Sequence, residues 1–203
     1  MPAADSSFLQ MPSTKTPRKP KTKTTAAARR PAGASVALPA SADADTLPPC
    51  DNEWFELRGS LIQGLGAFAK KDIPRGTRLI EYIGEKISYA ESDKRYPDTR
   101  DERHHTFLFT LNSKWIIDAA FGGNESRFIN HSCEPNCDAY IERGHIWIES
   151  IKRIPAGTEL AYDYQYEYLD EYTKEDLKFY SCRCGSAKCR GTIVAPKKKK
   201  KKA

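Results

Sequence analysis

The chain has 203 residues, a formal net charge of +6 and 39% hydrophobic residues, a fraction that is low for a chain packed throughout into one core. It contains no run that approaches the about 18 apolar residues of a membrane-spanning helix, and its first residues lack the charged and apolar regions of a secretory signal. These features argue against a membrane-spanning or secreted protein and predict an intracellular one.

The positive charge is concentrated at the two ends of the chain. Residues 1–50 contain seven Lys or Arg against three Asp, and residues 197–202 are six consecutive lysines, whereas residues 51–194 carry 20 Lys or Arg against 24 Asp or Glu. We therefore predict disordered basic tails, 1–50 and a poly-lysine tail over 195–203, that bind DNA or RNA non-specifically. The mildly acidic core suits a basic protein substrate. The alternative is that the tails only keep the protein soluble.

The core is predicted to be mostly β, with short strands and little helix. Strands are predicted within 53–62, within 63–69 after a glycine turn, along 76–87, in a hairpin over 106–120 that turns at Asn112 and Ser113, in a hairpin over 138–154 that turns near Arg143 and Gly144, and along 157–168. Ser88 and Glu91 have the spacing of a capping box and predict a helix over about 89–103. The similar segments KDIPRGT (71–77) and KRIPAGT (152–158) predict that one Pro-x-Gly turn is used twice.

The cysteine spacing indicates a metal site. In a reducing compartment, six cysteines favour a metal site or free thiols over disulfides. The segment CRCGSAKC places three of them in a C-x-C-x4-C cluster, one ligand short of a tetrahedral zinc site: Cys182, Cys184 and Cys189. Spacing alone leaves the fourth ligand open among a histidine, Cys50, Cys133 and Cys137. The alternative is that all six are free thiols.

Four segments, in this order, resemble the SET-domain protein lysine methyltransferases that carry a post-SET zinc segment: GLGAF (64–68), RFINHSCEPNC (127–137), ELAYDY (159–164) and CRCGSAKC (182–189). The resemblance covers about residues 52–194 and lacks a cysteine-rich pre-SET cluster. It implies a SET domain over 52–170 and a post-SET zinc segment over 178–194. The implied fold consists of several small β-sheets with short helices, in which RFINHSC and ELAYDY thread past each other as a pseudoknot.

The same resemblance implies two bound groups. S-adenosylmethionine would be held by the amide of Asn130 and by the backbone of His131 near the adenine, while the glycines let the backbone approach closely. His131 considered alone would be an ordinary hydrogen-bonded buried histidine. The implied cofactor-binding residues are Gly64, Leu65, Gly66, Phe107, Asn130, His131 and Arg183. One structural Zn²⁺ would be held by Cys133, Cys182, Cys184 and Cys189, which leaves Cys50 and Cys137 as plain thiols.

The chemistry that the resemblance implies would take place at the tyrosines of ELAYDYQYEY, which lie at every second position. Methyl transfer needs a neutral lysine amine, and with a pKa of about 10.4 its deprotonation at pH 7 costs about 4.6 kcal/mol, a cost that an apolar aromatic channel reduces. The resemblance implies that Tyr164 is the catalytic tyrosine and that Tyr162 sets how many methyl groups fit. A tyrosine there predicts mainly mono- or dimethyl-lysine. Phe107 stands where relatives often carry a tyrosine, and Tyr166 and Tyr168 are predicted to cover one face of a strand.

These observations predict a protein-lysine N-methyltransferase that transfers methyl groups from S-adenosylmethionine to a histone or another nucleic-acid-associated basic protein. Its expected location is the nucleus and chromosome of a eukaryote or the cytoplasm and nucleoid of a bacterium. The alternative is a catalytically inactive SET scaffold that binds nucleic acid or protein through its basic tails.

Overall fold

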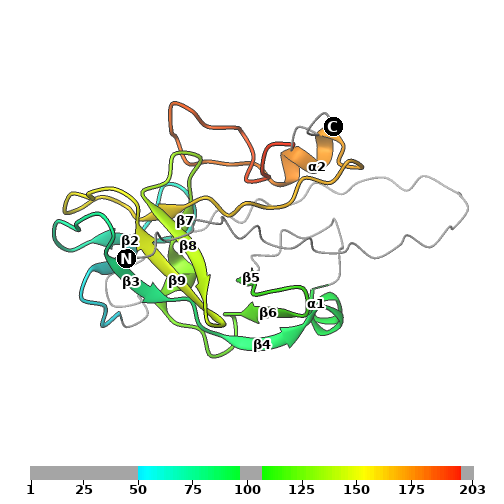
Figure 1. The fold of residues 1–203 in the computed structure, drawn as a ribbon. Helices are drawn as coiled ribbons and strands as arrows, with labels where there is room; N and C mark the ends of the chain where they lie inside the picture. Colours follow the sequence, from blue (N-terminus) through cyan, green and yellow to red (C-terminus); the bar gives the residue numbers. More distant parts are fainter. Residues whose placement is uncertain (1–49, 97–106, 198–203) are drawn as a thin grey trace, which may run out of the picture.

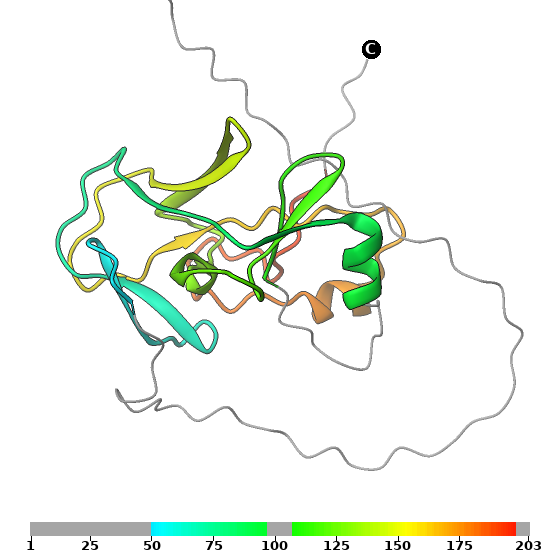
Figure 2. The same ribbon diagram turned by 90° about the horizontal axis from the view of Figure 1, so that it is seen from below.

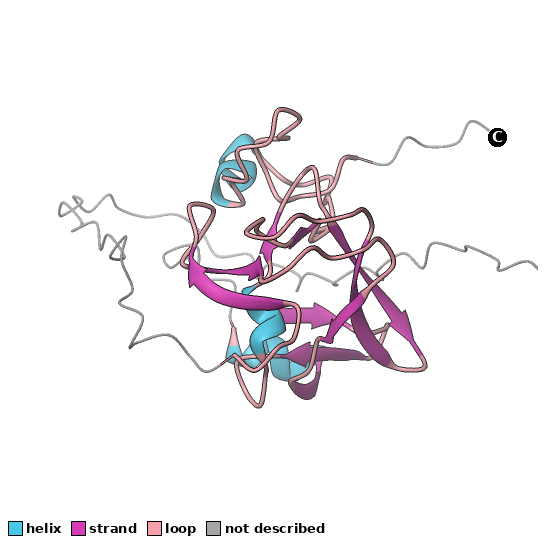
Figure 3. Cartoon of the chain, turned by 90° about the vertical axis from the view of Figure 1, so that its left-hand side faces the viewer, coloured by secondary structure: helices cyan, strands magenta, loops and turns pink. Residues whose placement is uncertain are grey.

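A computed structural model describes residues 50–96 and 107–197, so most of both predicted tails lies outside the described residues. The described chain forms four small β-sheets and two short α-helices, and Figure 3 shows that most of the remainder is loop. The predicted fold class is thus confirmed. The two helices lie toward one end of the molecule and the first hairpin lies toward the other (Figures 1 and 2). Neither helix has the length and hydropathy needed to cross a membrane.

In chain order the elements are β1 (Phe55–Gly59), β2 (Leu65–Ala69), β3 (Arg78–Glu81), β4 (Glu85–Ser88), α1 (Tyr89–Arg95), β5 (Leu108–Thr110), β6 (Trp115–Asp118), the 3-10 helix η2 (Glu125–Phe128), β7 (Asn130–His131), β8 (Cys137–Glu142), β9 (His145–Ser150), β10 (Ala161–Tyr162) and α2 (Lys174–Phe179). The sheets are β1-β2, β3-β9-β8, β4-β6-β5 and β10-β7, and only the last of these pairs is parallel.

Both predicted hairpins are confirmed. β5 and β6 pair around a turn in which Asn112 Oδ1 accepts hydrogen bonds from the Lys114 and Trp115 amides, at 2.9 and 3.1 Å. β8 and β9 pair around Arg143 and Gly144, which have φ angles of 51° and 86°. A two-residue turn of this kind needs positive φ at both central positions.

The single strand predicted along residues 76–87 is wrong, because the segment forms two strands in different sheets. β3 pairs with β9, whereas β4 pairs with β6. An added Cβ at Gly84 would lie 2.5 Å from Asp118 O, so the chain passes β6 too closely for a side chain. Apolar residues continue on both sides of this glycine, and their pattern therefore does not reveal the break.

The helix predicted from Ser88 begins as expected. Ser88 Oγ accepts a hydrogen bond from the Glu91 amide at 3.2 Å. The Glu91 carboxylate does not complete the predicted capping box, because it pairs instead with Arg95 Nε at 2.9 Å. α1 ends at Arg95 with Tyr96 as its C-cap, and residues 97–103 of the prediction lie outside the described residues.

α2 is not among the predicted elements, although a local signal for it exists. Thr173 Oγ1 accepts from the Asp176 amide at 3.2 Å, and the Asp176 carboxylate accepts from the Thr173 amide at 2.8 Å. These two bonds make a capping box. The helix has only six residues and buries none of them, so the sequence has no apolar periodicity there.

The two similar turn segments pair with each other. Ile73 and Ile154 are buried and exchange backbone hydrogen bonds of 2.8 and 2.9 Å. Gly76 and Gly157 have φ angles of 79° and 78°, which confirms that the same turn is used twice.

The segments with the predicted motifs meet in the parallel pair β7–β10, where Asn130 lies beside Ala161 and His131 beside Tyr162. The buried side chain of Asn136 spans both segments. Its Nδ2 donates to Glu159 O and its Oδ1 accepts from the Ala161 amide, both at 2.8 Å. The two segments therefore lie side by side, as the resemblance implies.

The long strand predicted along 157–168 is wrong. β10 contains only Ala161 and Tyr162, and Gln165 has a φ of 53°. This left-handed residue interrupts the period-two alternation, so the four tyrosines do not share one face of a regular strand.

Asn136→Ala is expected to lower the free energy of unfolding by about 2–4 kcal/mol, because it leaves buried backbone groups at the β7–β10 crossing without partners. Urea unfolding measures the change. Asn112→Ala is the matched control, since Asn112 is exposed and also caps two backbone amides. Equal losses in the two variants would contradict a special role for the buried amide.

Candidate active site and metal cluster

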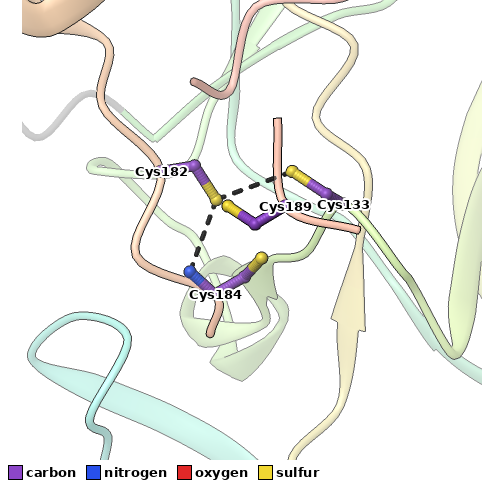
Figure 4. A group of neighbouring side chains, drawn as sticks. All are labelled: Cys133, Cys182, Cys184 and Cys189. Atoms are coloured by element: carbon purple, nitrogen blue, oxygen red, sulfur yellow. Dashed lines mark hydrogen bonds between the residues drawn. The ribbon is translucent and has the colours of Figure 1, made fainter. Parts of the chain in front are cut away.

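Four cysteines from distant parts of the sequence come together, as Figure 4 shows. The sulfur atoms of Cys133, Cys182, Cys184 and Cys189 all lie within 4.8 Å of one another. The Cys133 and Cys182 sulfurs are 3.7 Å apart, which is close to the about 3.8 Å edge of a tetrahedron with Zn–S bonds of about 2.3 Å. The number, type and spacing of these ligands fit a structural zinc site.

Cys50 and Cys137, the other candidates that spacing leaves open, lie outside the cluster. Cys137 is fully buried in the hydrophobic core, and the Cys50 thiol donates to Phe55 O. None of the six cysteines is in a disulfide.

Backbone amides surround the cysteine cluster. The amides of Arg190, Cys184 and Gly191 donate to the sulfurs of Cys133, Cys182 and Cys189 respectively, each at 3.4 Å. Burial pulls the pKa of the Cys184 thiol upward, but hydrogen bonds from Ser186 and from the backbone bring it down to about 6. Burial raises the pKa of Cys182. Four adjacent thiolates need a cation between them, and a bound Zn²⁺ would supply it.

His131 joins the cysteine cluster to the tyrosine segment. Its Nδ1 accepts from the Tyr164 amide at 3.1 Å, so the proton lies on Nε2, 3.5 Å from Cys133 Sγ. His131 is 4% exposed, and burial lowers its pKa to about 4. The neutral ring therefore fixes Tyr164 and a predicted metal ligand at the same time.

An ion pair makes a second link between the same two parts. Arg190 donates through both terminal nitrogens to both carboxylate oxygens of Asp163, at 2.6 and 2.9 Å. Asp163 lies between Tyr162 and Tyr164 in ELAYDY, and Arg190 follows Cys189 directly. One of these residues lies within a predicted motif and the other directly follows one, but the motifs do not indicate that they meet.

Asn130 holds the glycine turn in place. Its Nδ2 donates to Leu65 O at 3.0 Å and to Glu159 Oε1 at 2.8 Å. Gly64 has a φ of 48°, which favours glycine, and an added Cβ at Gly66 would collide with the Glu159 carboxylate. The backbone thus favours glycine at position 64, and a side chain at position 66 would displace Glu159. Glu159 is a further member of the site that the sequence does not indicate.

The free donors and acceptors near this turn fit the amino-acid end of S-adenosylmethionine. No donor in the described part of the chain reaches Asn130 Oδ1, so this atom can accept from an ammonium group. Arg127 lies on η2, which packs against β2, and its Nε is buried without a partner among the described residues. This nitrogen is an unused donor that is closed off from solvent, so a carboxylate would reach it only after the neighbouring side chains move.

Tyr162 and Tyr164 lie in a buried aromatic cluster. Their ring centroids are 4.9 Å apart, and Tyr162 stacks on Phe109 at 6.2 Å. Tyr164 Oη donates to Ile129 O at 3.0 Å. Burial raises the pKa of both tyrosines above the ordinary value, so both hydroxyls stay protonated at physiological pH.

Phe107 belongs to the same apolar region, and its carbonyl accepts from Tyr82 Oη at 2.8 Å. The Tyr82 ring lies 5.2 Å from Phe109. Tyr82 therefore places a buried hydroxyl beside Phe107, the position at which relatives often carry a tyrosine hydroxyl and this chain does not. Its signal in the sequence is a tyrosine directly after the apolar strand β3.

Arg183, the remaining predicted cofactor-binding residue, is exposed. Its role in cofactor binding stays a prediction. The arginine of the cysteine loop that contacts the tyrosine segment is Arg190. Leu65 contributes its carbonyl oxygen to the hydrogen bond with Asn130.

A comparison with protein families matches the SET domain to residues 64–165, a range that contains the glycine turn, Asn130, His131, Tyr162 and Tyr164. The chain belongs to the SET domain family. The match ends before Cys182, so the metal cluster stands on its geometry and not on the family match.

The SET domain is also similar to longer curated relatives. The chain is 39% identical over 145 residues to histone-lysine N-methyltransferase 2D of Homo sapiens, a match that covers 68% of the chain and 2% of the relative. It is 37% identical over 164 residues to histone-lysine N-methyltransferase trithorax of Drosophila virilis, a match that covers 78% of the chain and 4% of the relative. It is 40% identical over 136 residues to histone-lysine N-methyltransferase SETD2 of Mus musculus, a match that covers 64% of the chain and 5% of the relative. The chain thus spans only a small part of these relatives.

Proposed function

We propose that this protein is an S-adenosylmethionine-dependent protein-lysine N-methyltransferase whose substrate is a histone or another basic protein associated with nucleic acid. The observation that carries the proposal is the position of His131. This residue hydrogen-bonds to the Tyr164 segment and to the cysteine cluster, and it follows Asn130 in the parallel pair. The names of the relatives support histone lysines as the substrate class.

Two groups would fit the residues described. S-adenosylmethionine would supply a methyl group on a sulfonium, and its amino-acid end would be held by Asn130, Arg127 and the Gly64–Gly66 turn. One Zn²⁺ would be held by the four clustered cysteines. This metal would be structural, with no open position for a substrate.

The aromatic cluster performs two tasks for a substrate lysine. Apolar walls disfavour the ammonium form and lower its pKa, which reduces the deprotonation cost of about 4.6 kcal/mol at pH 7. The Tyr164 hydroxyl donates its proton to Ile129 O, so its oxygen is left to accept a hydrogen bond from the amine. This contact orients the nitrogen, and orientation contributes several kcal/mol to rate enhancement.

The test uses purified full-length protein and S-adenosylmethionine with a labelled methyl group. It offers mixed histones, a lysate of the source organism and the enzyme alone, each beside Tyr164→Phe. Label on a protein band that disappears in the variant supports lysine methylation and identifies the substrate class. No label, despite cofactor binding and one zinc per chain, would overturn the enzymatic proposal and favour an inactive scaffold.

Tyr162→Phe is expected to shift the product toward higher methylation. The Tyr162 side chain is buried against Tyr164 and Phe109, so removal of its hydroxyl leaves space beside the amine. Mass spectrometry of a single-lysine peptide at matched turnover measures the product. We expect mainly mono- or dimethyl-lysine from the wild type and more trimethyl-lysine from the variant. Mostly trimethyl product from the wild type would contradict this role.

A chromosomal location, in a nucleus or a nucleoid, is part of the same proposal. The predicted binding of nucleic acid by the tails concerns mostly residues outside the described ranges and stays a prediction.

A further inference from the structure

Tyrosine rings form a continuous row from Tyr164 to the surface near α2. Ring centroids are 6.5 Å apart for Tyr164 and Tyr166, 5.7 Å for Tyr166 and Tyr180, 5.7 Å for Tyr180 and Tyr172, and 6.3 Å for Tyr172 and Tyr168. Aromatic faces of this kind attract cationic side chains. The proposed methylation site is therefore connected to an aromatic surface that suits a basic peptide.

A lysine of the chain itself occupies the outer end of this row. Lys197 Nζ lies 2.7 Å from Asp170 Oδ1 and 5.5 Å from the centroid of the Tyr168 ring. The backbone before it is fixed, because Val194 is buried and the Ala195 amide donates to Tyr166 O at 2.7 Å. Lys197 is also the first of six consecutive lysines.

A cavity of about 350 Å³ lies beside this contact. Figure 1 shows the end of the described chain, in red, near α2, and the cavity lies between these segments. Its lining includes Tyr168, Leu177 and Val194, together with Arg190, which holds Asp163 in the tyrosine segment. The lysine contact, the cavity and the proposed active site are therefore adjacent.

We propose that Tyr168 and Asp170 form a subsite for a basic side chain of the protein substrate, and that Lys197 fills this subsite in cis as a pseudosubstrate. The inference rests on the proposed function. It adds a site that recognises a basic residue of the substrate and a lysine of the chain that competes for that site. The Lys197 and Asp170 side chains are 61% and 73% exposed, so water screens their attraction. A contact of this strength can be displaced by a substrate, as competition requires.

A similar contact elsewhere in the molecule provides a matched control. Lys71 Nζ pairs with Glu53 at 2.6 Å and lies 4.3 Å from the Trp54 ring centroid. This lysine comes two residues after β2, and the hairpin formed by β1 and β2 lies at the end of the molecule opposite the helices (Figure 2). Lys71→Gln therefore removes the same kind of charge and ring contact without affecting the proposed subsite.

The test compares fluorescein-labelled peptides that carry one central lysine flanked either by arginines or by glutamines. Fluorescence anisotropy gives the dissociation constant for full-length protein, and methyl transfer gives KM and kcat. Lys197→Gln is expected to tighten binding of the arginine-flanked peptide and lower its KM by about three- to tenfold, with kcat unchanged. A second variant with residues 197–202 all changed to glutamine prevents a neighbouring lysine from taking the vacated place.

Dependence on Asp170 distinguishes a subsite from a general loss of positive charge. In an Asp170→Asn background, either lysine variant is expected to give no gain, because the carboxylate that binds both competitors is gone. Gains that persist in that background, or lysine variants that bind like Lys71→Gln, would overturn the proposal. Fluorescence anisotropy measures binding and needs no turnover. If the protein transfers no methyl group, the proposed function is contradicted, but the binding data still test the subsite.

Discussion

Tyr164→Phe is expected to lower kcat by about a hundredfold or more, the usual effect of removing one hydrogen-bonding group that acts on the reacting atoms. The aromatic contacts of Tyr164 with His131 and Tyr162 survive in phenylalanine. The amide that donates to His131 is unchanged as well. The fold and cofactor affinity should therefore change little, with a loss of about 1 kcal/mol in unfolding free energy for the lost bond to Ile129 O.

Steady-state methyl transfer, isothermal titration with S-adenosylmethionine and urea unfolding together test this expectation. Tyr140→Phe is the control, because its hydroxyl accepts a hydrogen bond from Arg78 on the β3-β9-β8 sheet, outside the aromatic cluster. We expect that control to keep wild-type kcat. An unchanged kcat in Tyr164→Phe would show that the hydroxyl takes no part in the reaction and that the ring only packs against its neighbours.

Loss of the metal is expected to abolish methyl transfer and to weaken cofactor binding at least tenfold. Residues 181–191 are all exposed or half-buried, so apolar burial contributes little to their order. Zinc contributes about 10–16 kcal/mol to the folding of zinc-finger peptides. When this segment is released, the Arg190 contact with Asp163 is lost, and Cys133, the sulfur partner of His131, is separated from the other three clustered sulfurs. The ion pair to the Tyr164 segment then disappears, and the link through His131 no longer reaches the cysteine loop.

Two routes to the metal-free state make this test specific. Chelation should be reversible by added Zn²⁺, whereas Cys184→Ser should not be. Cys50→Ser is the matched thiol variant and should keep one zinc per chain by elemental analysis. Zinc-free protein with full activity, or a wild type that purifies without zinc, would contradict the proposed role of the cluster.

The sequence predicted the parts of the fold that depend on local contacts. The turns at Asn112 and at Arg143–Gly144 lie where expected, because residues adjacent in the chain specify them. The two strands within 76–87 and the short β10 could not be predicted in this way. The first requires the close approach of Gly84 to Asp118, and the second depends on the left-handed conformation of Gln165, which a glutamine does not signal.

The candidate site shows the same division. The resemblance predicted roles for Asn130, His131 and the four clustered cysteines, because the motifs of the family assign roles to these positions. Residues whose roles depend on distant partners were missed, namely Tyr82, Asn136, Glu159, Asp163 and Arg190. Each of them acts through a contact with a segment far away in the sequence. A single sequence considered alone gives no information about such pairings.

The parallel pairing of β7 with β10 also affects how the protein forms during synthesis. Asn130 pairs with a residue 31 positions later in the chain, and Cys133 meets Cys182 across a separation of 49 residues. Contacts of such long range close slowly, because the loop between them must first be ordered. A nascent chain that has reached residue 181 has the glycine turn, the tyrosines and one of the four clustered sulfurs. Its proposed cofactor-binding surface therefore forms without the segment that would complete it.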